Sequence, residues 1–89
     1  MDRVTIKPTT LSRELEGETV LVDIDSGTYF GLDEVGTVIW RLIGENVPTT
    51  DIPARLTEEF DVDEHTARTD FEALLAELLS KGLVEDAGR

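Results

Sequence analysis

The fold is organised around residues 20–32, which read VLVDIDSGTYFGL. Two β-prone runs, 20–24 and 28–32, flank the polar triplet Asp25-Ser26-Gly27. This triplet suits a tight antiparallel turn, because glycine adopts positive φ without a steric penalty. The stretch therefore predicts a β-hairpin. Its second strand runs directly into Asp33-Glu34-Val35, which is typical of a helix N-cap and first turn, and we expect it at a sheet edge.

The residues before the hairpin predict one more strand. Alternating apolar positions in residues 4–8, bounded by Thr and Pro, indicate a short edge strand that pairs with residues 20–24. Residues 11–18 are largely polar and show no clear period, and they end in Glu16-Gly17-Glu18. We interpret them as a loop that finishes in a turn.

Alternation also predicts the two faces of the first hairpin strand. Val20, Val22 and Ile24 share one face, whereas Leu21 and Asp23 share the other. This is the pattern of a half-buried strand. It places Asp23 near water.

Helical periodicity begins directly after the hairpin. The first helix is expected over residues 34–43, ends at Gly44 and carries Trp40 as a core anchor. A second helix follows a connecting loop. We expect Thr50 as its N-cap and Pro53 in its first turn, where a missing N–H costs no hydrogen bond.

The longest helix is expected over residues 64–81, between an N-cap at Asp63 and a C-terminal cap at Gly82. Residues 83–84 form a staple or a short strand, and residues 85–89 are expected to fray. The apolar stripe of this helix consists of Ala67, Phe71, Leu74, Leu75, Leu78 and Leu79. The element order predicts an α+β winged helix-turn-helix, with a three-stranded antiparallel sheet followed by three helices.

Composition limits the class of protein. Residues 1–89 are expected to form a single domain with a core of about 4–84. The chain has no Cys, so neither a disulfide nor a thiolate metal site is expected, and its one His cannot build a metal site alone. We find no signal peptide and no apolar run of about 20 residues, and we expect a cytoplasmic protein that does not bind membranes.

The charge is strongly acidic, with 20 acidic against 8 basic side chains and a formal net charge of -12. This field opposes nucleic acid, because non-specific binding depends on Lys and Arg at the phosphates. The third helix, which would enter a DNA groove, begins with acidic residues. A basic peptide or protein would be attracted instead. The other interpretation is that the acidity serves solubility alone.

No residue pattern typical of catalysis is visible. The chain lacks a Gly-rich phosphate loop, a His-Glu metal pair and a Ser-His-Asp set, and Asp23 and Asp25 lack the spacing of a calcium loop. His65 lies in the first turn of a helix, where we interpret it as an exposed polar side chain. We therefore expect no enzymatic activity, no cofactor and no metal.

A binding surface is the remaining possibility. Residues 28–32 contain no charge and no Pro, and Gly31 lets a partner backbone approach closely, so this edge can accept a strand from another chain. The apolar wall beside it would consist of Phe71, Leu74, Leu75 and Leu78. In the alternative interpretation these side chains are ordinary core and the N-terminus of the chain covers the edge.

The run VDIDSGTYFGLDEVGTVIW, residues 22–40, resembles the PqqD family. Further matches are Val62-Asp63, Asp70, residues 74–78 and the closing Gly82-Leu83-Val84. The resemblance covers about residues 20–84. It implies a small winged helix-turn-helix that recognises ribosomally made, modified peptides, known as RiPPs. Such domains hold the precursor's leader peptide as an extra strand between the third strand and the third helix, and they do no chemistry.

Within the family, a free-standing chain of this size resembles the recognition subunit of the split leader peptidase in lasso-peptide biosynthesis. The resemblance implies that it delivers the precursor to a separate cysteine-protease subunit and then to a cyclase. It assigns the backbone ladder to Thr28, Tyr29, Phe30, Gly31 and Leu32. It assigns the pocket walls to Phe71, Leu74, Leu75 and Leu78, and contacts with basic or hydroxyl groups of the leader to Asp70 and Glu77.

Three alternatives stay open at this point. In the same family, the chain is a peptide chaperone of the PQQ pathway, which carries a tyrosine-containing precursor to a radical SAM enzyme. In a second class it is a winged-helix DNA-binding regulator, which the charge disfavours. In a third it is an oligomerising module that pairs its open edge with a second copy, whereas we expect a monomer.

Overall fold

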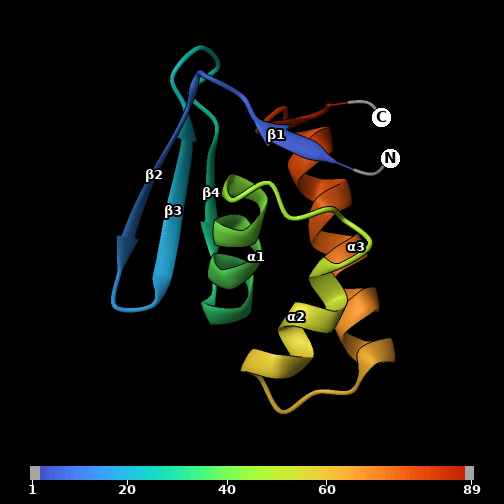
Figure 1. Ribbon diagram of the computed structural model, residues 1–89. Coiled ribbons are helices and arrows are strands. Elements are labelled where there is room, and N and C mark those ends of the chain that lie inside the picture. Colours follow the sequence, from blue (N-terminus) through green and yellow to red (C-terminus); the bar gives the residue numbers. More distant parts are fainter. Residues whose placement is uncertain (1–2, 88–89) are drawn as a thin grey trace.

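The computed structural model describes residues 3–87, which form an α+β fold of helices and antiparallel sheets (Figure 1). The elements are β1 Val4–Ile6, β2 Thr10–Leu15, β3 Glu18–Asp23, β4 Tyr29–Leu32, α1 Glu34–Gly44, α2 Ile52–Glu59, α3 Glu64–Ser80 and β5 Val84–Asp86. One sheet has the strand order β2-β3-β4, and the other pairs β1 with β5. The three predicted helices are confirmed within one or two residues at each end.

The division into two sheets corrects our expected strand pairing. β1 pairs with β5 at the end of the chain rather than with the hairpin. The third strand of the larger sheet is β2, which lies in residues that we interpreted as a loop. Five of its six residues are exposed, so backbone pairing with β3 rather than an apolar face holds it in place. The winged helix-turn-helix arrangement stays a prediction.

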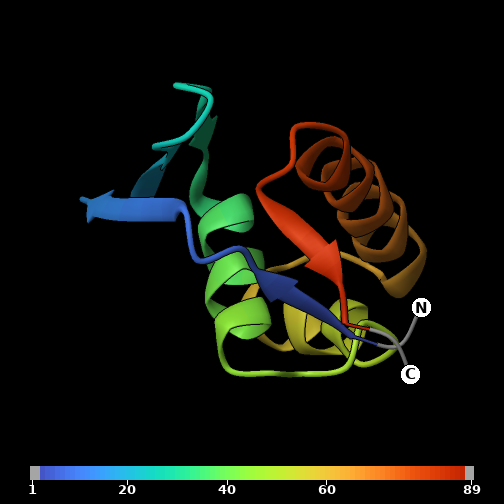
Figure 2. The same cartoon turned by 90° about the horizontal axis from the view of Figure 1, so that it is seen from above.

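The ends of the chain also differ from expectation. Glu85 and Asp86, which we expected to fray, pair with Thr5 and Val4 in the smaller sheet. This pairing places β1 beside β5, the strand that follows α3, as Figure 2 shows from above. Residues 88–89 lie outside the described part of the chain.

The predicted hairpin is formed by β3 and β4. Its register pairs Val22 with Tyr29 and Thr19 with Leu32. Gly27 closes the turn at a φ of 76°, which is the left-handed conformation that the sequence predicted for this glycine. β4 lies at the edge of the sheet, as predicted.

The faces of β3 are the reverse of those that we expected. Leu21 is fully buried and Asp23 is only 7% exposed, whereas Val20 is 48% exposed. The turn explains the difference, because the Asp23 carboxylate accepts hydrogen bonds from the Asp25 N–H at 3.2 Å and the Ser26 hydroxyl at 3.0 Å. Because these hydrogen-bond donors lie in the adjoining turn, the Asp23 carboxylate can face the interior without remaining unpaired.

α1 is the centre of the fold. It contacts β1, β3, β4, α2 and α3, and from above it stands between the larger sheet and the β1–β5 pair (Figure 2). Asp33 caps it as predicted, since its carboxylate accepts a hydrogen bond from the Gly36 N–H at 2.8 Å. Trp40 is buried in the core, which confirms its predicted role as an anchor.

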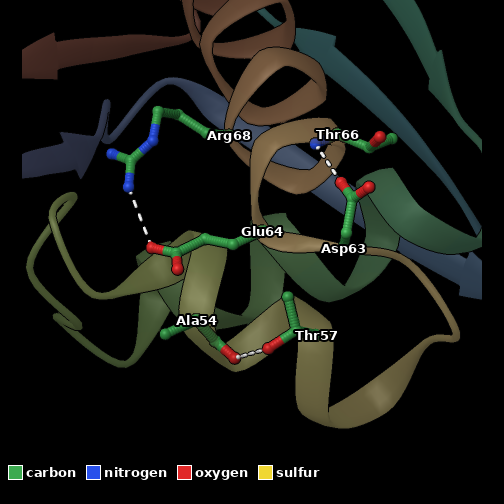
Figure 3. A network of polar contacts seen from close by, with 6 residues as sticks. All are labelled: Ala54, Thr57, Asp63, Glu64, Thr66 and Arg68. Atoms are coloured by element: carbon green, nitrogen blue, oxygen red, sulfur yellow. Dashed lines mark hydrogen bonds and ion pairs between the residues drawn. The ribbon is translucent and has the colours of Figure 1, made fainter.

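α2 and α3 complete the helical layer. Asp63 caps α3 by accepting from the Thr66 N–H at 2.7 Å, and Glu64 pairs with Arg68 at 2.9 Å (Figure 3). Gly82 follows α3 at a φ of 73°, which confirms its predicted capping role. α2 begins one residue later than expected, with Asp51 rather than Thr50 in the N-cap position.

A single buried hydrogen bond connects the larger sheet to α1. The hydroxyls of Thr19 on β3 and Thr37 on α1 lie 2.9 Å apart, and both residues are buried. Within residues 3–87, each of these hydroxyls is the hydrogen-bond partner of the other, in a layer that is otherwise apolar. This pair therefore fixes how the hairpin sits on the central helix.

Replacing Thr37 by Val is expected to lower the free energy of unfolding by roughly 1–3 kcal/mol, because the Thr19 hydroxyl is left buried without its partner. Replacing both residues removes the orphaned group, so Thr19→Val/Thr37→Val should cost less than the two single changes added together. Urea denaturation of the four proteins gives the coupling. Additive losses would contradict this role for the pair.

Asp23 makes stability depend on pH. A hydrogen bond from the Thr9 side chain, followed by that from the Asp25 N–H, holds the pKa of Asp23 below its ordinary value. Because the unfolded chain has the ordinary pKa, the ionised carboxylate stabilises the fold above about pH 4. This contribution is lost as the pH falls through the lower pKa of the folded state.

Asp23→Asn should therefore reduce stability at neutral pH and flatten the decline in stability as the pH falls below about 4. The exposed Asp61→Asn variant is the matched control and should keep the wild-type profile. The measurement is the urea midpoint of each protein across this pH range. An unchanged profile for Asp23→Asn would show that the turn does not depend on the charge.

Candidate functional site

A groove of about 680 Å³ lies between the sheet edge and α3. The end of β4 and the first turns of α1 contribute one wall, which consists of Gly31, Leu32, Asp33, Val35, Gly36 and Ile39. One face of α3 contributes the other, which consists of Asp70, Ala73, Leu74 and Glu77. These four positions have the spacing i, i+3, i+4, i+7 that brings residues together on one helical face.

The hairpin register decides which backbone groups of β4 are open. The Asp23 N–H donates to the Thr28 carbonyl at 2.9 Å, so every second residue from Thr28 onward bonds to β3. The N–H and C=O groups of Tyr29 and Gly31 therefore point away from the sheet. Within residues 3–87 no strand pairs with this side of β4.

The N-terminus does not cover this edge. β1 pairs with β5, and the strand order leaves β4 outermost. Our alternative interpretation, in which the start of the chain protects the edge, is therefore wrong. β4 is an uncharged strand edge, of the kind that proteins use to accept a strand from a partner.

The lining of the groove is both apolar and acidic. Val35, Ile39 and Leu74 supply the apolar surface. Asp70 and Glu77 add two carboxylates from α3, and no hydrogen bond or ion pair within residues 3–87 engages either of them. No basic side chain lines the groove. An extended ligand with an apolar side chain and a nearby donor or positive charge fits this surface.

One contact joins the two walls beyond the groove. The Lys81 ammonium lies 5.5 Å from the centre of the Phe30 ring, within the range of a cation–π interaction. Lys81 is the C-cap of α3, and Phe30 belongs to β4. The contact therefore holds the open strand and the end of the long helix at a fixed spacing.

The structure separates the predicted site residues into three groups. Those that line the groove are Gly31, Leu32, Asp70, Leu74 and Glu77. Those that precede them on the same strand edge are Thr28, Tyr29 and Phe30. Those outside the groove are Phe71 and Leu78, which are buried in the core, and Leu75, which is partly buried. The buried pair can support the wall from behind, but it does not form its surface.

Several groove residues escaped the sequence analysis. Asp33 and Val35 had been interpreted only as the cap and first turn of the first helix, Ile39 only as part of that helix, and Ala73 lies outside the apolar stripe of the third. The sequence feature that we missed is the small side chain of residues such as Gly36, which lines the groove. At Gly36 a Cβ would lie only 3.1 Å from the Leu32 Cβ, so any larger residue requires Leu32 to shift where β4 meets α1.

These features define a small α+β domain with an open strand edge beside an acidic groove. The chain belongs to the PqqD family, because the family model described as Coenzyme PQQ synthesis protein D (PqqD) matches residues 18–84. The match begins with β3 and ends with the first residue of β5. It thus includes the hairpin, the three helices and every residue of the groove, and it confirms the resemblance drawn from the sequence.

Two solved structures are similar to the whole chain. TbiB1 in complex with the TbiA(beta) leader peptide is 34% identical, with a TM-score of 0.86 over 96% of this chain and 99% of that chain. Lasso peptide synthetase B1 complexed with the leader peptide is 24% identical, with a TM-score of 0.84 over 94% of this chain and 99% of that chain, and shows the fold alone. No curated protein sequence matches the chain significantly.

Proposed function

We propose that this chain is a non-catalytic recognition element that binds the leader region of a ribosomally synthesised precursor peptide by strand addition. The observation that carries the proposal is the open backbone of Tyr29 and Gly31 beside the groove. The likeness to TbiB1, which was solved in complex with a leader peptide, supports it. Residues 1–89 act as one recognition domain, with a core of about 4–84.

In this mechanism the leader extends the larger sheet as a strand next to β4. The N–H and C=O groups of Tyr29 and Gly31 supply the main-chain bonds, which hold any sequence equally. Alternate leader side chains then enter the groove, because side chains along a strand point to opposite faces. An apolar leader residue fits against Leu74 and Ile39. A neighbouring Lys, Arg or hydroxyl side chain can reach Asp70 or Glu77.

The bound leader is delivered to enzymes that the chain does not contain. We propose a separate leader-peptidase subunit of the cysteine-protease class and a cyclase as these partners, as in lasso-peptide biosynthesis, and a monomer as the working form. The proposed site is the cytoplasm, where the ribosome produces the precursor. In residues 3–87 no helix is long and apolar enough to cross a membrane.

Two other functions are less well supported. A peptide chaperone of the PQQ pathway, working with a radical SAM enzyme, is consistent with the family model, but TbiB1, which is 34% identical to this chain, was solved in complex with the TbiA(beta) leader peptide. A winged-helix DNA-binding regulator needs a basic third helix. Here α3 begins with Glu64 after an Asp63 cap and presents Asp70 and Glu77 to the groove.

Gly31→Pro tests strand addition directly. The Gly31 N–H points away from β3, so proline removes a donor to the leader and no bond within the sheet. We expect the affinity for the leader to fall roughly tenfold or more, since the partner carbonyl is also left unpaired. The measurement is fluorescence anisotropy of a labelled leader, taken from the small reading frame next to this gene.

Gly31→Ala is the matched control for this experiment. A Cβ at position 31 meets no atom within 4 Å, so alanine keeps the N–H and should keep the affinity within about twofold. Circular dichroism establishes that both variants are folded. Unchanged leader binding by folded Gly31→Pro, with the wild type binding saturably, rules out the main-chain mechanism.

The two free carboxylates should make binding depend on salt. Asp70→Asn/Glu77→Gln keeps the shape of the groove and removes its charge, so a leader with basic residues should bind roughly three- to tenfold more weakly and with less sensitivity to NaCl. Glu72→Gln, on the exposed side of α3, is the control and should change little. Equal salt dependence in the double variant and the wild type would place the electrostatic attraction elsewhere.

A further inference from the structure

The larger sheet has a second apolar surface, on the face turned away from α1. Five large side chains form it: Leu11, Leu15, Val20, Ile24 and Tyr29, which are 53%, 62%, 48%, 61% and 73% exposed. We refer to them as the outer face. We propose that the outer face docks a partner protein with an apolar surface framed by basic side chains. The inference rests on the proposed function, and the partner is the enzyme that processes the bound precursor.

The outer face is continuous across three strands. Leu11 on β2 pairs with Val22 on β3, which pairs with Tyr29 on β4, and cross-strand partners lie on the same side of a sheet. A shallow depression of about 540 Å³ runs along these rows. In Figure 1 and Figure 2 the helices and the β1–β5 pair all lie on the other side of the sheet.

This exposure is not explained by the stability of the domain. The inner face of β3 buries Leu21 in the core, whereas the five side chains of the outer face are at least 48% exposed and lie outside the core cluster. Isolated apolar side chains are common on protein surfaces, but a contiguous patch of several hundred Å² typically marks an interface. The strands could have carried polar residues here at no cost to the core.

The charges around the outer face select the kind of partner. Arg13 lies among the apolar side chains, and Glu18 lies at one end of the face, on the same side of β3 as Val20. The adjoining turns add the acidic residues Glu16 and Asp25. A partner that matches this pattern has Lys or Arg around an apolar surface and an acceptor that meets Arg13.

A second copy of this chain fits less well. It would bring another formal charge of -12 to the interface, and its own acidic turns would lie close to those of the first copy. The repulsion opposes a dimer through this face at neutral pH. A basic-framed protein is attracted by the same field, which favours a heterologous partner.

The outer face and the groove can be occupied together. Tyr29 belongs to both, because its side chain lies on the outer face while its backbone points to the open edge. A protein docked on the outer face therefore borders the added leader strand. This arrangement presents the leader to the docked enzyme without releasing it from the groove.

The test is a pair of double variants that keep the β-propensity of the strands. Leu11→Thr/Val20→Thr makes the outer face polar, and Leu11→Ile/Val20→Ile keeps it apolar. Binding to the purified leader-protease subunit is measured by biolayer interferometry, and leader binding by anisotropy on the same preparations. We expect the Thr variant to bind the protease roughly tenfold or more weakly, with leader affinity within about twofold of wild type, and the Ile variant to bind both normally.

Other outcomes overturn the inference. If the Thr variant binds the protease as tightly as the wild type, the outer face is not the docking surface. If the wild type does not bind the protease but sediments as a dimer that the Thr variant loses, the occupant is a second copy. Failure of the proposed function is seen separately, since the wild type then fails to bind the leader at all.

Discussion

The backbone hydrogen bond from the Asp23 N–H to the Thr28 carbonyl fixes the hairpin register, and both surfaces described above depend on that register. A strand has a period of two for its backbone groups and for its side chains. Once Thr28 bonds inward, Tyr29 and Gly31 must leave their backbone groups open. The same alternation sends Leu21 into the core and Val20 to the outer face. A shift by one residue would exchange all of these roles.

The turn that sets the register is stabilised by the charged carboxylate of Asp23, a buried residue, and charged residues are rarely buried. Asp23 lies on the inner face of β3, and the chain around the turn supplies its partners. Because these hydrogen bonds favour the ionised form, the pKa of Asp23 lies below its ordinary value, and the carboxylate stays charged at neutral pH. The acidity of the chain is therefore not only a property of its surface. The Asp23 carboxylate is structural, as are the helix caps Asp33 and Asp63, whereas Asp70 and Glu77 are free to meet a ligand.

Sequence patterns predicted the local elements well and the long-range pairings poorly. Asp33, Asp63 and Gly82 were identified because caps depend on residues within one turn of the helix end. β2 was missed because Thr10 is its only buried residue, so no apolar alternation marks it. The pairing of β1 with β5 joins the two ends of the chain, and no local signal encodes such a contact.

The same limit explains how much of the groove was foreseen. The resemblance to the PqqD family indicated Gly31, Asp70 and Glu77, which the structure does place together at the groove. The apolar stripe of the third helix, in contrast, mixed Leu74, which faces the groove, with Leu78, which is buried. Periodicity identifies a stripe but not which neighbour each member meets. That depends on where β4 and α1 lie relative to α3.

The larger sheet has a second edge, and its neighbours explain why the proposed leader strand is not added there. On β2, the Thr10 hydroxyl donates to the Leu83 carbonyl at 3.0 Å, and Glu14 pairs with Arg41 at 3.0 Å. These contacts place polar and charged groups along the strand, as proteins do to protect an edge. β4 differs in having no charge and in bordering a groove that offers apolar side chains. In the proposed mechanism, strand addition therefore has one productive edge, because main-chain bonds alone hold a peptide weakly without pockets for its side chains.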